Sequence, residues 1–192
     1  MKKAIYLDRD GVINAIHYDE DIGLCTPHTP GEFVFLQNVS KSVKTINSSG
    51  FLAVVVCNQP DVSKGRLAMN VHEKINEKMI SGLIEKGAKL DGIYYCFHKS
   101  SDGCECRKPK PGMLLQAAKD LDIELKNSYI VGDTLSDIEA GKAAGCKTIL
   151  VANPRLDLIK IIKERGCDPD YIAKDLEDAI NIILSLEMQG VI

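Results

Sequence analysis

The sequence predicts an α/β fold built on a doubly wound, Rossmann-like parallel sheet, because short apolar runs alternate with amphipathic segments along the chain. The run Leu52–Val56 is apolar at every position, as is typical of strands covered on both faces. No repeat or low-complexity linker interrupts the alternation. In such folds ligands bind at the carboxyl ends of the strands, so polar residues that follow a strand are the first candidates for a site.

The expected strands are Ala4–Leu7, Phe51–Val56, Gly92–Cys96, Ser128–Val131 and Thr148–Val151, with an edge strand at Tyr171–Ala173. The expected helices are Val39–Ser48, Asn70–Lys86, Gly112–Leu121, Leu135–Ala144, Pro154–Arg165 and Leu176–Glu187. One apolar stripe is expected on the second of these helices, formed by Val71, Ile75, Met79, Leu83 and Ile84. Asn153 is expected to cap the fifth helix, with Pro154 at its first position.

The length of 192 residues fits a single domain, residues 1–192, with one substantial core. The formal net charge of −3 gives no general attraction to nucleic acid or to an anionic membrane, so neither is an expected partner. The apolar start of the chain is too short for a secretion signal, and no window is long enough to span a bilayer. We therefore expect a cytoplasmic protein, and a monomer, whose anionic substrate is met by local positive groups and a metal.

Two stretches do not fit the alternation of strands and helices. Residues 17–29 form a polar segment after the first strand, and residues 96–111 form a Cys-, Lys- and Pro-rich segment after the third. We expect both to be loops at the same edge of the sheet. Long loops in a compact domain are usually functional or disordered, and the aromatic, His and Cys residues here are atypical of disorder.

Two pairs of acidic residues follow predicted strands. Asp8 and Asp10 are separated by one residue, so in an extended chain their side chains share a face. Crowded carboxylates need a cation to stay ionised, and Mg²⁺ accepts such oxygens alongside phosphate. Asp133 again follows an apolar strand directly, and Asp137 comes one helical turn later. Taken alone, the first pair is equally consistent with a solvated acidic turn, and the second with an acidic helix start.

Basic and small polar residues stand at two further strand or helix boundaries. Arg107 and Lys108 precede a helix within a proline-bounded turn, where they could neutralise a phosphate group. Cys57 and Asn58 end the second predicted strand, where backbone amides could hold phosphate oxygens. An ordinary basic turn and a simple strand end are the alternatives.

In this order along the chain, the four segments resemble the haloacid dehalogenase-like phosphatases, over about Ile5 to Val151. The resemblance implies a phosphatase of this fold without a large cap domain. It implies that Asp8 is the nucleophile that becomes phosphorylated and that Asp10 is the general acid and base. It also implies a Mg²⁺ ion held by Asp8, Asp133 and the backbone carbonyl of Asp10.

By the same resemblance, Lys108 pairs with the nucleophile and the phosphate, and Asn58 binds phosphate through its backbone amide. Asp137 is expected to lie next to the metal ligands rather than to bind the metal directly. The family has Ser or Thr where this chain has Cys57, and a thiol is a weaker hydrogen-bond donor than a hydroxyl. We also expect Arg107 to contact the substrate.

A second metal site is predicted by Cys96, His98, Cys104 and Cys106, since three thiolates and one imidazole suit tetrahedral Zn²⁺. The set leaves no open position, so the zinc should be structural and should brace the Arg-Lys pair that follows it. The other Cys and His residues are not expected to be ligands: Cys25 and His28 lack two further partners, Cys146 and Cys167 are expected to be buried, and His17 and His72 are expected at the surface.

The zinc loop narrows the resemblance to the branch of histidinol-phosphate and heptose-bisphosphate phosphatases. Residues 96–113 and Asn58-Gln59 are more similar to the enzymes that act on D-glycero-D-manno-heptose 1,7-bisphosphate, whereas the short gap from His98 to Cys104 also fits the histidinol-phosphate type. We therefore expect a small phosphorylated sugar, hydrolysed at its 7-phosphate, as the substrate. Histidinol phosphate is the alternative, and a zinc-stabilised binding protein without turnover is a third.

Overall fold

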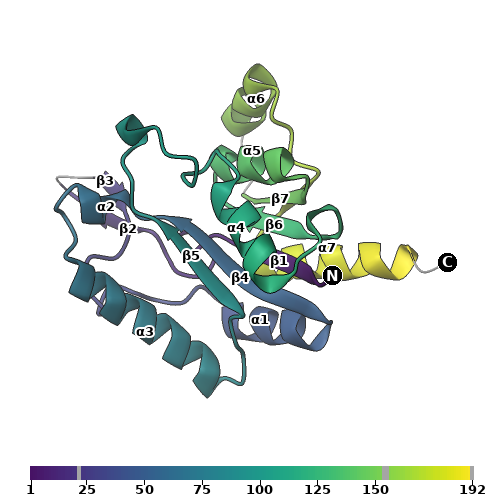
Figure 1. The fold of residues 1–192 in the computed structure, drawn as a ribbon, viewed down its shortest axis with the longest axis horizontal. Helices are drawn as coiled ribbons and strands as arrows, with labels where there is room; N and C mark the ends of the chain where they lie inside the picture. The colour runs from purple at the N-terminus through teal and green to yellow at the C-terminus, as the bar shows by residue number, and fades with distance from the viewer. Residues whose placement is uncertain (21–22, 153–155, 191–192) are drawn as a thin grey trace.

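The computed structural model describes residues 1–20, 23–152 and 156–190 (Figure 1). Its main sheet has six strands in the order β5-β4-β1-β6-β7-β8, and each neighbouring pair is parallel. The strands are β1 (Lys3–Leu7), β4 (Phe51–Asn58), β5 (Gly92–Cys96), β6 (Tyr129–Gly132), β7 (Lys147–Val151) and β8 (Tyr171–Ala173). The predicted α/β class, parallel sheet and edge strand are confirmed.

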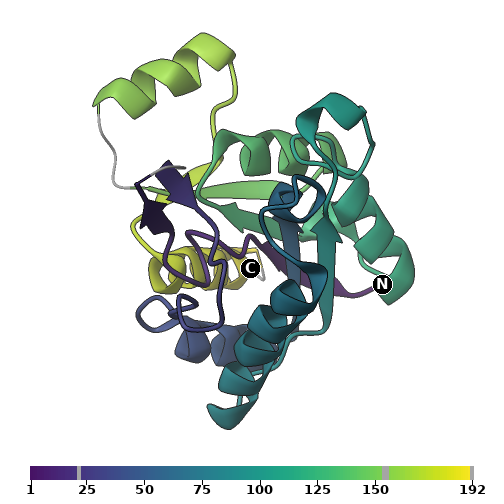
Figure 2. The same cartoon turned by 90° about the vertical axis from the view of Figure 1, so that its left-hand side faces the viewer.

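Helices cover both faces of the sheet, as the alternation of side chains in the strands requires. The helices are α1 (Val39–Ser48), α2 (Pro60–Ser63), α3 (Met69–Glu85), α4 (Gly112–Leu121), α5 (Leu135–Ala144), α6 (Leu156–Arg165) and α7 (Leu176–Gln189). Apolar residues of α1, α3 and α7 pack on one face of the sheet, and those of α4 and α5 pack on the other, while α6 lies at the periphery (Figures 1 and 2). The chain also contains two short 3₁₀ helices, Ser100–Asp102 and Leu125–Asn127.

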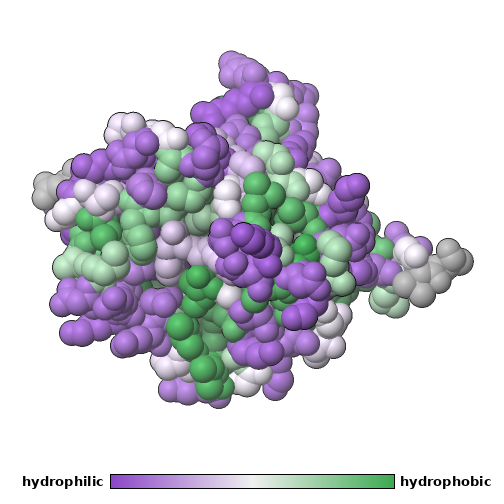
Figure 3. All heavy atoms as spheres, viewed as in Figure 1, coloured by the Kyte–Doolittle hydropathy of each residue, from purple (hydrophilic) through white to green (hydrophobic). Residues whose placement is uncertain are grey.

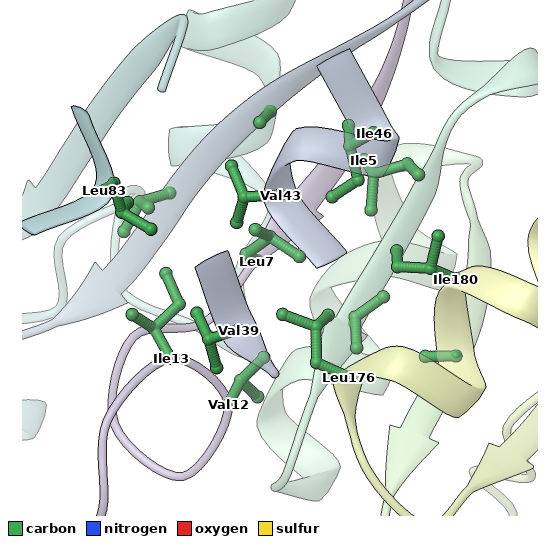
Figure 4. Close-up of a cluster of buried hydrophobic side chains, with 14 of the residues drawn as sticks. Ile5, Leu7, Val12, Ile13, Val39, Val43, Ile46, Leu83, Leu176 and Ile180 are labelled. Carbon is green, nitrogen blue, oxygen red and sulfur yellow. The ribbon is translucent and has the colours of Figure 1, made fainter. Parts of the chain in front are cut away.

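Strand β1 shows how the sequence divides between the two faces. Ile5 and Leu7 belong to one apolar cluster, and Ala4 and Tyr6 belong to the other. In Figure 4, Ile5 and Leu7 lie among side chains from α1, α7 and the turn after β1, and Leu83 of α3 lies to the left in the same cluster. The core therefore lies directly beneath the carboxyl end of β1, and it supports the residues that follow Leu7.

Several local predictions differ from the structure. Residues 17–29, expected to be a loop, contain a short antiparallel hairpin of β2 (His17–Asp19) and β3 (Gly23–Cys25). The short helix α2 was not predicted, because its four residues have no apolar repeat. Ile84, expected on the buried stripe of α3, is 60% exposed, since the stripe ends at Leu83. The predicted cap at Asn153 and Pro154 lies outside the described residues.

Hydrophilic residues predominate on the face of the molecule seen in Figure 3, and apolar residues form smaller groups among them. Within residues 1–20, 23–152 and 156–190, none of the helices has the length and apolar character needed to cross a bilayer.

Candidate active site

The ends of three adjacent strands bring the predicted acidic and polar residues together. Leu7, the last residue of β1, is paired with Val55 of β4 on one side and Val131 of β6 on the other. The backbone amide of Asp8 continues the pairing, since it donates to the carbonyl of Val131 at 3.0 Å. Asp8 therefore leaves the central strand of the sheet between the ends of its two neighbours, as expected for a parallel α/β site.

A cavity of about 640 Å³ opens at this edge of the sheet. Its lining includes most of the predicted site residues, namely Asp8, Asp10, Cys57, Asn58, Lys108 and Asp133. The lining also includes Ile16, Thr26, Gln59, Asp61, Lys64 and Arg66. The volume suffices for a small phosphorylated metabolite.

Lys108 is the buried cation of the site. Its ammonium nitrogen lies 2.9 Å from Asp8 Oδ2 and 2.5 Å from Asp137 Oδ1, and it donates to the carbonyl of Val56 at 2.9 Å. Burial opposes its charge, but Asp137 and Asp8 together raise the pKa of Lys108 above its ordinary value. Lys108 therefore stays protonated beside Asp8.

The carboxylates outnumber this one lysine. Oxygens of Asp8, Asp133 and Asp137 lie within 4.8 Å of one another. Burial, with Asp137 and Asp10 adding to it and Lys108 opposing, raises the pKa of Asp8 to about 6. Burial and the neighbouring Asp8 raise the pKa of Asp133 to about 8. Such buried, mutually repelling oxygens are a donor set that fits Mg²⁺, because a divalent cation would offset both the burial and the repulsion.

Asp137 is committed to the protein rather than free to bind a metal. Its Oδ1 accepts from Lys108, and its Oδ2 accepts from the Thr134 backbone amide at 3.1 Å and from the Thr134 hydroxyl at 2.6 Å. Thr134 and Asp137 thereby form a capping box at the start of α5. Both oxygens are therefore engaged, which favours Asp8 and Asp133 as the side-chain ligands of a metal.

Gly11 explains how the turn after β1 fits against Asp133. A Cβ atom added to Gly11 would lie 2.1 Å from Asp133 Oδ2, and the residue has a φ of +82°. Only glycine combines this backbone conformation with so close an approach. The turn that contains Asp10 is thus packed directly on the second acidic pair.

Asp10 lies in a cluster of donors that the sequence did not reveal. Its carboxylate accepts from Arg9, from the Asn14 amide at 2.9 Å and from the Gln59 amide at 2.6 Å. Arg9, Asn14 and Gln59 are each 0% exposed. The sequence does show charged and amide residues near the predicted catalytic acid. However, their positions along the chain do not predict that their side chains are buried against Asp10.

Two predicted phosphate contacts differ from the rest of the site. Cys57 borders the cavity but is only 2% exposed, and its sulfur accepts from Gln59 Nε2 at 3.3 Å. Burial, with Asp8 and Asp10 nearby, raises the pKa of this thiol well above its usual value. Arg107 is not brought into the cavity: its guanidinium donates to the carbonyl of His98 at 3.2 Å, and it borders a smaller pocket beside Cys104.

The four predicted zinc ligands converge. The sulfur of Cys96 lies 3.7 Å from that of Cys104 and 3.2 Å from that of Cys106, and His98 Nδ1 lies 3.6 Å and 3.3 Å from the sulfurs of Cys96 and Cys106. Ligands at the corners of a tetrahedral zinc site with Zn–S bonds of about 2.3 Å lie about 3.8 Å apart. The donor set and its spacing therefore fit a structural Zn²⁺ ion.

The other Cys and His residues serve different roles. His28 contacts Asp61 at 3.2 Å, and neither it nor Cys25 joins a metal-binding cluster of described residues. Cys146 and Cys167 are buried and His17 is exposed, as expected. The prediction that His72 lies at the surface is wrong. It is 3% exposed, because its ring on α3 packs edge-on against the rings of Tyr95 and Phe97.

Comparisons with known proteins show to which family the chain belongs. The HAD-hydrolase-like family model matches residues 105–179. The D-glycero-β-D-manno-heptose-1,7-bisphosphate 7-phosphatase of Pasteurella multocida is 35% identical, over 97% of this chain and all of the relative. The protein of the same name from Haemophilus influenzae is 39% identical over the same shares of the two chains.

A similar solved structure is that of D,D-heptose 1,7-bisphosphate phosphatase from B. bronchiseptica, complexed with magnesium and phosphate. It has a TM-score of 0.82 and 30% identity, over 96% of this chain and 99% of that one. The chain therefore belongs to the HAD-like phosphatases, in the family that contains the heptose-bisphosphate 7-phosphatases.

Proposed function

We propose that this protein is a magnesium-dependent phosphatase that removes the 7-phosphate of D-glycero-D-manno-heptose 1,7-bisphosphate through an aspartyl-phosphate intermediate. The observation that carries the proposal is the contact of Lys108 Nζ with Asp8 Oδ2 at 2.9 Å, at the end of the central strand and within the cavity. A buried lysine beside a carboxylate both orients the carboxylate and offers a positive charge to an incoming phosphate. The names of the similar proteins support the choice of substrate.

In the first displacement, an oxygen of Asp8 attacks phosphorus and the bond from phosphorus to the sugar oxygen breaks. Asp10 gives its proton to that sugar oxygen. In the second displacement, Asp10 takes a proton from water, whose oxygen attacks phosphorus and releases inorganic phosphate from Asp8. The two acids lie on one short turn, closed by hydrogen bonds from Ile13 and Asn14 to the Arg9 carbonyl at 2.8 Å and 3.1 Å.

Asp8, Asp133 and the carbonyl of Asp10 would hold Mg²⁺, which when bound neutralises charge on the phosphoryl group. Lys108 balances the charge of Asp8, and Asp137 orients Lys108 from behind. Asn58 keeps its proposed contact with phosphate through its backbone amide. Cys57 and Arg107 are weaker candidates, because the first is buried against Gln59 and the second faces the Cys/His cluster.

We propose that Cys96, His98, Cys104 and Cys106 bind a structural zinc ion. The loop that they would fix, residues 96–106, leads directly into Arg107 and Lys108. The small phosphorylated substrate supports our expectation of a cytoplasmic enzyme.

Hydrolysis kinetics over a panel of phosphate esters test this function. We expect the highest kcat/KM for the heptose bisphosphate, release of the 7-phosphate alone, and dependence on added Mg²⁺. A preference for histidinol phosphate would reassign the substrate within the branch. Absence of turnover of any ester in the presence of Mg²⁺ would instead favour a binding protein.

A further inference from the structure

We propose that Arg9 is a positioning residue that fixes the carboxyl group of Asp10 for proton transfer. The inference rests on the proposed acid–base role of Asp10. Arg9 Nε donates to Asp10 Oδ1 at 3.2 Å, and Nη2 lies 3.1 Å from both Oδ1 and Oδ2. The planar guanidinium thus contacts both oxygens of the carboxylate, which defines the rotation of the carboxyl plane as well as its place.

The protein in turn holds the guanidinium rigidly. Arg9 is 0% exposed, its Nη2 also donates to the hydroxyl of Thr26, and its Cζ lies 5.8 Å from the centre of the Tyr95 ring. Its remaining nitrogen, Nη1, is buried without a hydrogen-bond partner among the described residues. Thr26 follows the β2–β3 hairpin and Tyr95 belongs to β5, so elements on two sides of the turn hold Arg9 in place.

Fold stability alone is a poor account of this arrangement. Desolvating a charged pair can cost as much free energy as the attraction returns, so a buried ion pair is a weak stabilising device. One nitrogen of Arg9 is also left without a partner, which adds to the cost of burial. The pair supplies geometry instead. Asp10 lies on a turn outside the sheet, and without the fork, which is the two-pronged contact from Arg9, only single donors would orient it: the amides of Asn14 and Gln59, and the Cys57 thiol at 3.8 Å.

The proposed role of Arg9 should matter for some phosphate esters and not for others. Asp10 must reach the leaving oxygen of a sugar, because an alkoxide is a poor leaving group without a proton. An aryl phosphate such as p-nitrophenyl phosphate releases a phenolate that needs no proton. Loss of Arg9 should therefore slow phosphorylation of Asp8 by a sugar phosphate and spare phosphorylation by the aryl ester.

The test compares the first chemical step for the two kinds of ester. Arg9→Met removes the fork at similar volume, and the pre-steady-state burst of p-nitrophenolate reports phosphorylation by the aryl ester. We expect single-turnover cleavage of the sugar phosphate to fall about 10- to 100-fold, the effect of misplacing a catalytic group by about 1 Å, and the burst rate to change less than about threefold. Equal loss with both esters, or no loss with either, would overturn the positioning role.

Three further variants make the test decisive. Arg9→Lys retains the buried charge but not the fork, so it is the better-folded variant and should show the same selective loss, smaller in size. Asp10→Asn serves as the reference and should show the selective loss in full. Absence of selectivity in Asp10→Asn would remove the acid role and the Arg9 proposal together, whereas selectivity in Asp10→Asn alone would remove only the Arg9 proposal. Arg165→Met, at an exposed position on α6, is the matched control and should leave both rates unchanged.

Discussion

Asn58 and Lys108 form a reciprocal pair of hydrogen bonds across 50 positions of the chain. The Asn58 side-chain amide donates to the Lys108 carbonyl at 3.0 Å, and the Lys108 backbone amide donates to Asn58 Oδ1 at 3.1 Å. The strand end of β4 thereby fixes the backbone from which the Lys108 side chain reaches Asp8. This gives Asn58 a part in the site beyond the phosphate contact proposed from the sequence.

Asn58→Ala should therefore lower kcat while the fold survives. We expect about a 10- to 100-fold loss, because Lys108 would no longer be held in one position, and a loss of about 1–3 kcal/mol in the free energy of unfolding from the two hydrogen bonds. The chain offers a matched control in Asn47, which makes the same reciprocal pair with Lys89, at 3.1 Å and 2.9 Å, outside the site. Asn47→Ala should reduce stability and leave kcat unchanged; equal effects of the two substitutions on kcat would refute the role of Asn58.

Gly11→Ala should weaken activation by magnesium. The new methyl group would lie 2.1 Å from Asp133 Oδ2 and must displace that carboxylate. Gly50→Ala is the control, since Gly50 has nearly the same φ, +81°, with nothing within 4 Å of the added atom. Both substitutions should destabilise the fold by about 1–2 kcal/mol through backbone strain, but only Gly11→Ala should raise the Mg²⁺ concentration for half-maximal activity. A normal magnesium titration for Gly11→Ala would show that Asp133 is not a ligand.

The Cys/His cluster predicts about one zinc ion per chain. Cys104→Ser should reduce the zinc content and the melting temperature, because the loop from Cys96 to Cys106 would lose one of four ligands. Elemental analysis and a melting curve measure both. Cys167→Ser, at a buried cysteine outside the cluster, should keep its zinc. A stable, fully active protein without zinc would rule out the structural role.

The burial of His72 predicts a pH dependence of stability. Burial and the nearby Arg9 lower the pKa of His72 to about 4 from an ordinary value of 6.5. The unfolded chain therefore binds more protons between these values, so the stability due to neutral His72 is complete above pH 6.5 and is lost as the pH falls toward 4. At pH 5 the loss should reach up to about 2 kcal/mol. Denaturant unfolding of wild type and His72→Gln at pH 7.5 and pH 5 should show a smaller drop in the variant; identical drops would mean that folding does not lower the pKa of His72.

The fold and the centre of the site were predictable for the same physical reason. Strands such as 51–56 are recognisable from continuous apolar runs, and parallel strands must bring their carboxyl ends to one edge. The convergence of Asp8, Asp133 and Asn58 follows from that rule alone. The cluster of Cys96, His98, Cys104 and Cys106 was predictable because its four residues are close in sequence as well as in space.

The remainder depended on tertiary packing that has no local signal. The hairpin at residues 17–25 consists of two three-residue strands, which are too short to show alternation. Arg9 and His72 are residue types that usually lie at the surface or are only partly buried. Both are buried here, and both pack against the ring of Tyr95. Asn58 pairs with Lys108 through contacts between distant segments, and sequence spacing does not reveal such contacts.

The proposed mechanism requires that Asp8 carries the phosphoryl group during turnover. Mass spectrometry of the protein, quenched in acid while it hydrolyses heptose bisphosphate with Mg²⁺, would detect this intermediate. We predict a phosphorylated peptide with the modification on Asp8, formed at a rate that supports turnover and absent from Asp8→Asn, which should also release no phosphate. Rapid hydrolysis without phosphorylated Asp8, together with full activity of Asp8→Asn, would contradict the mechanism.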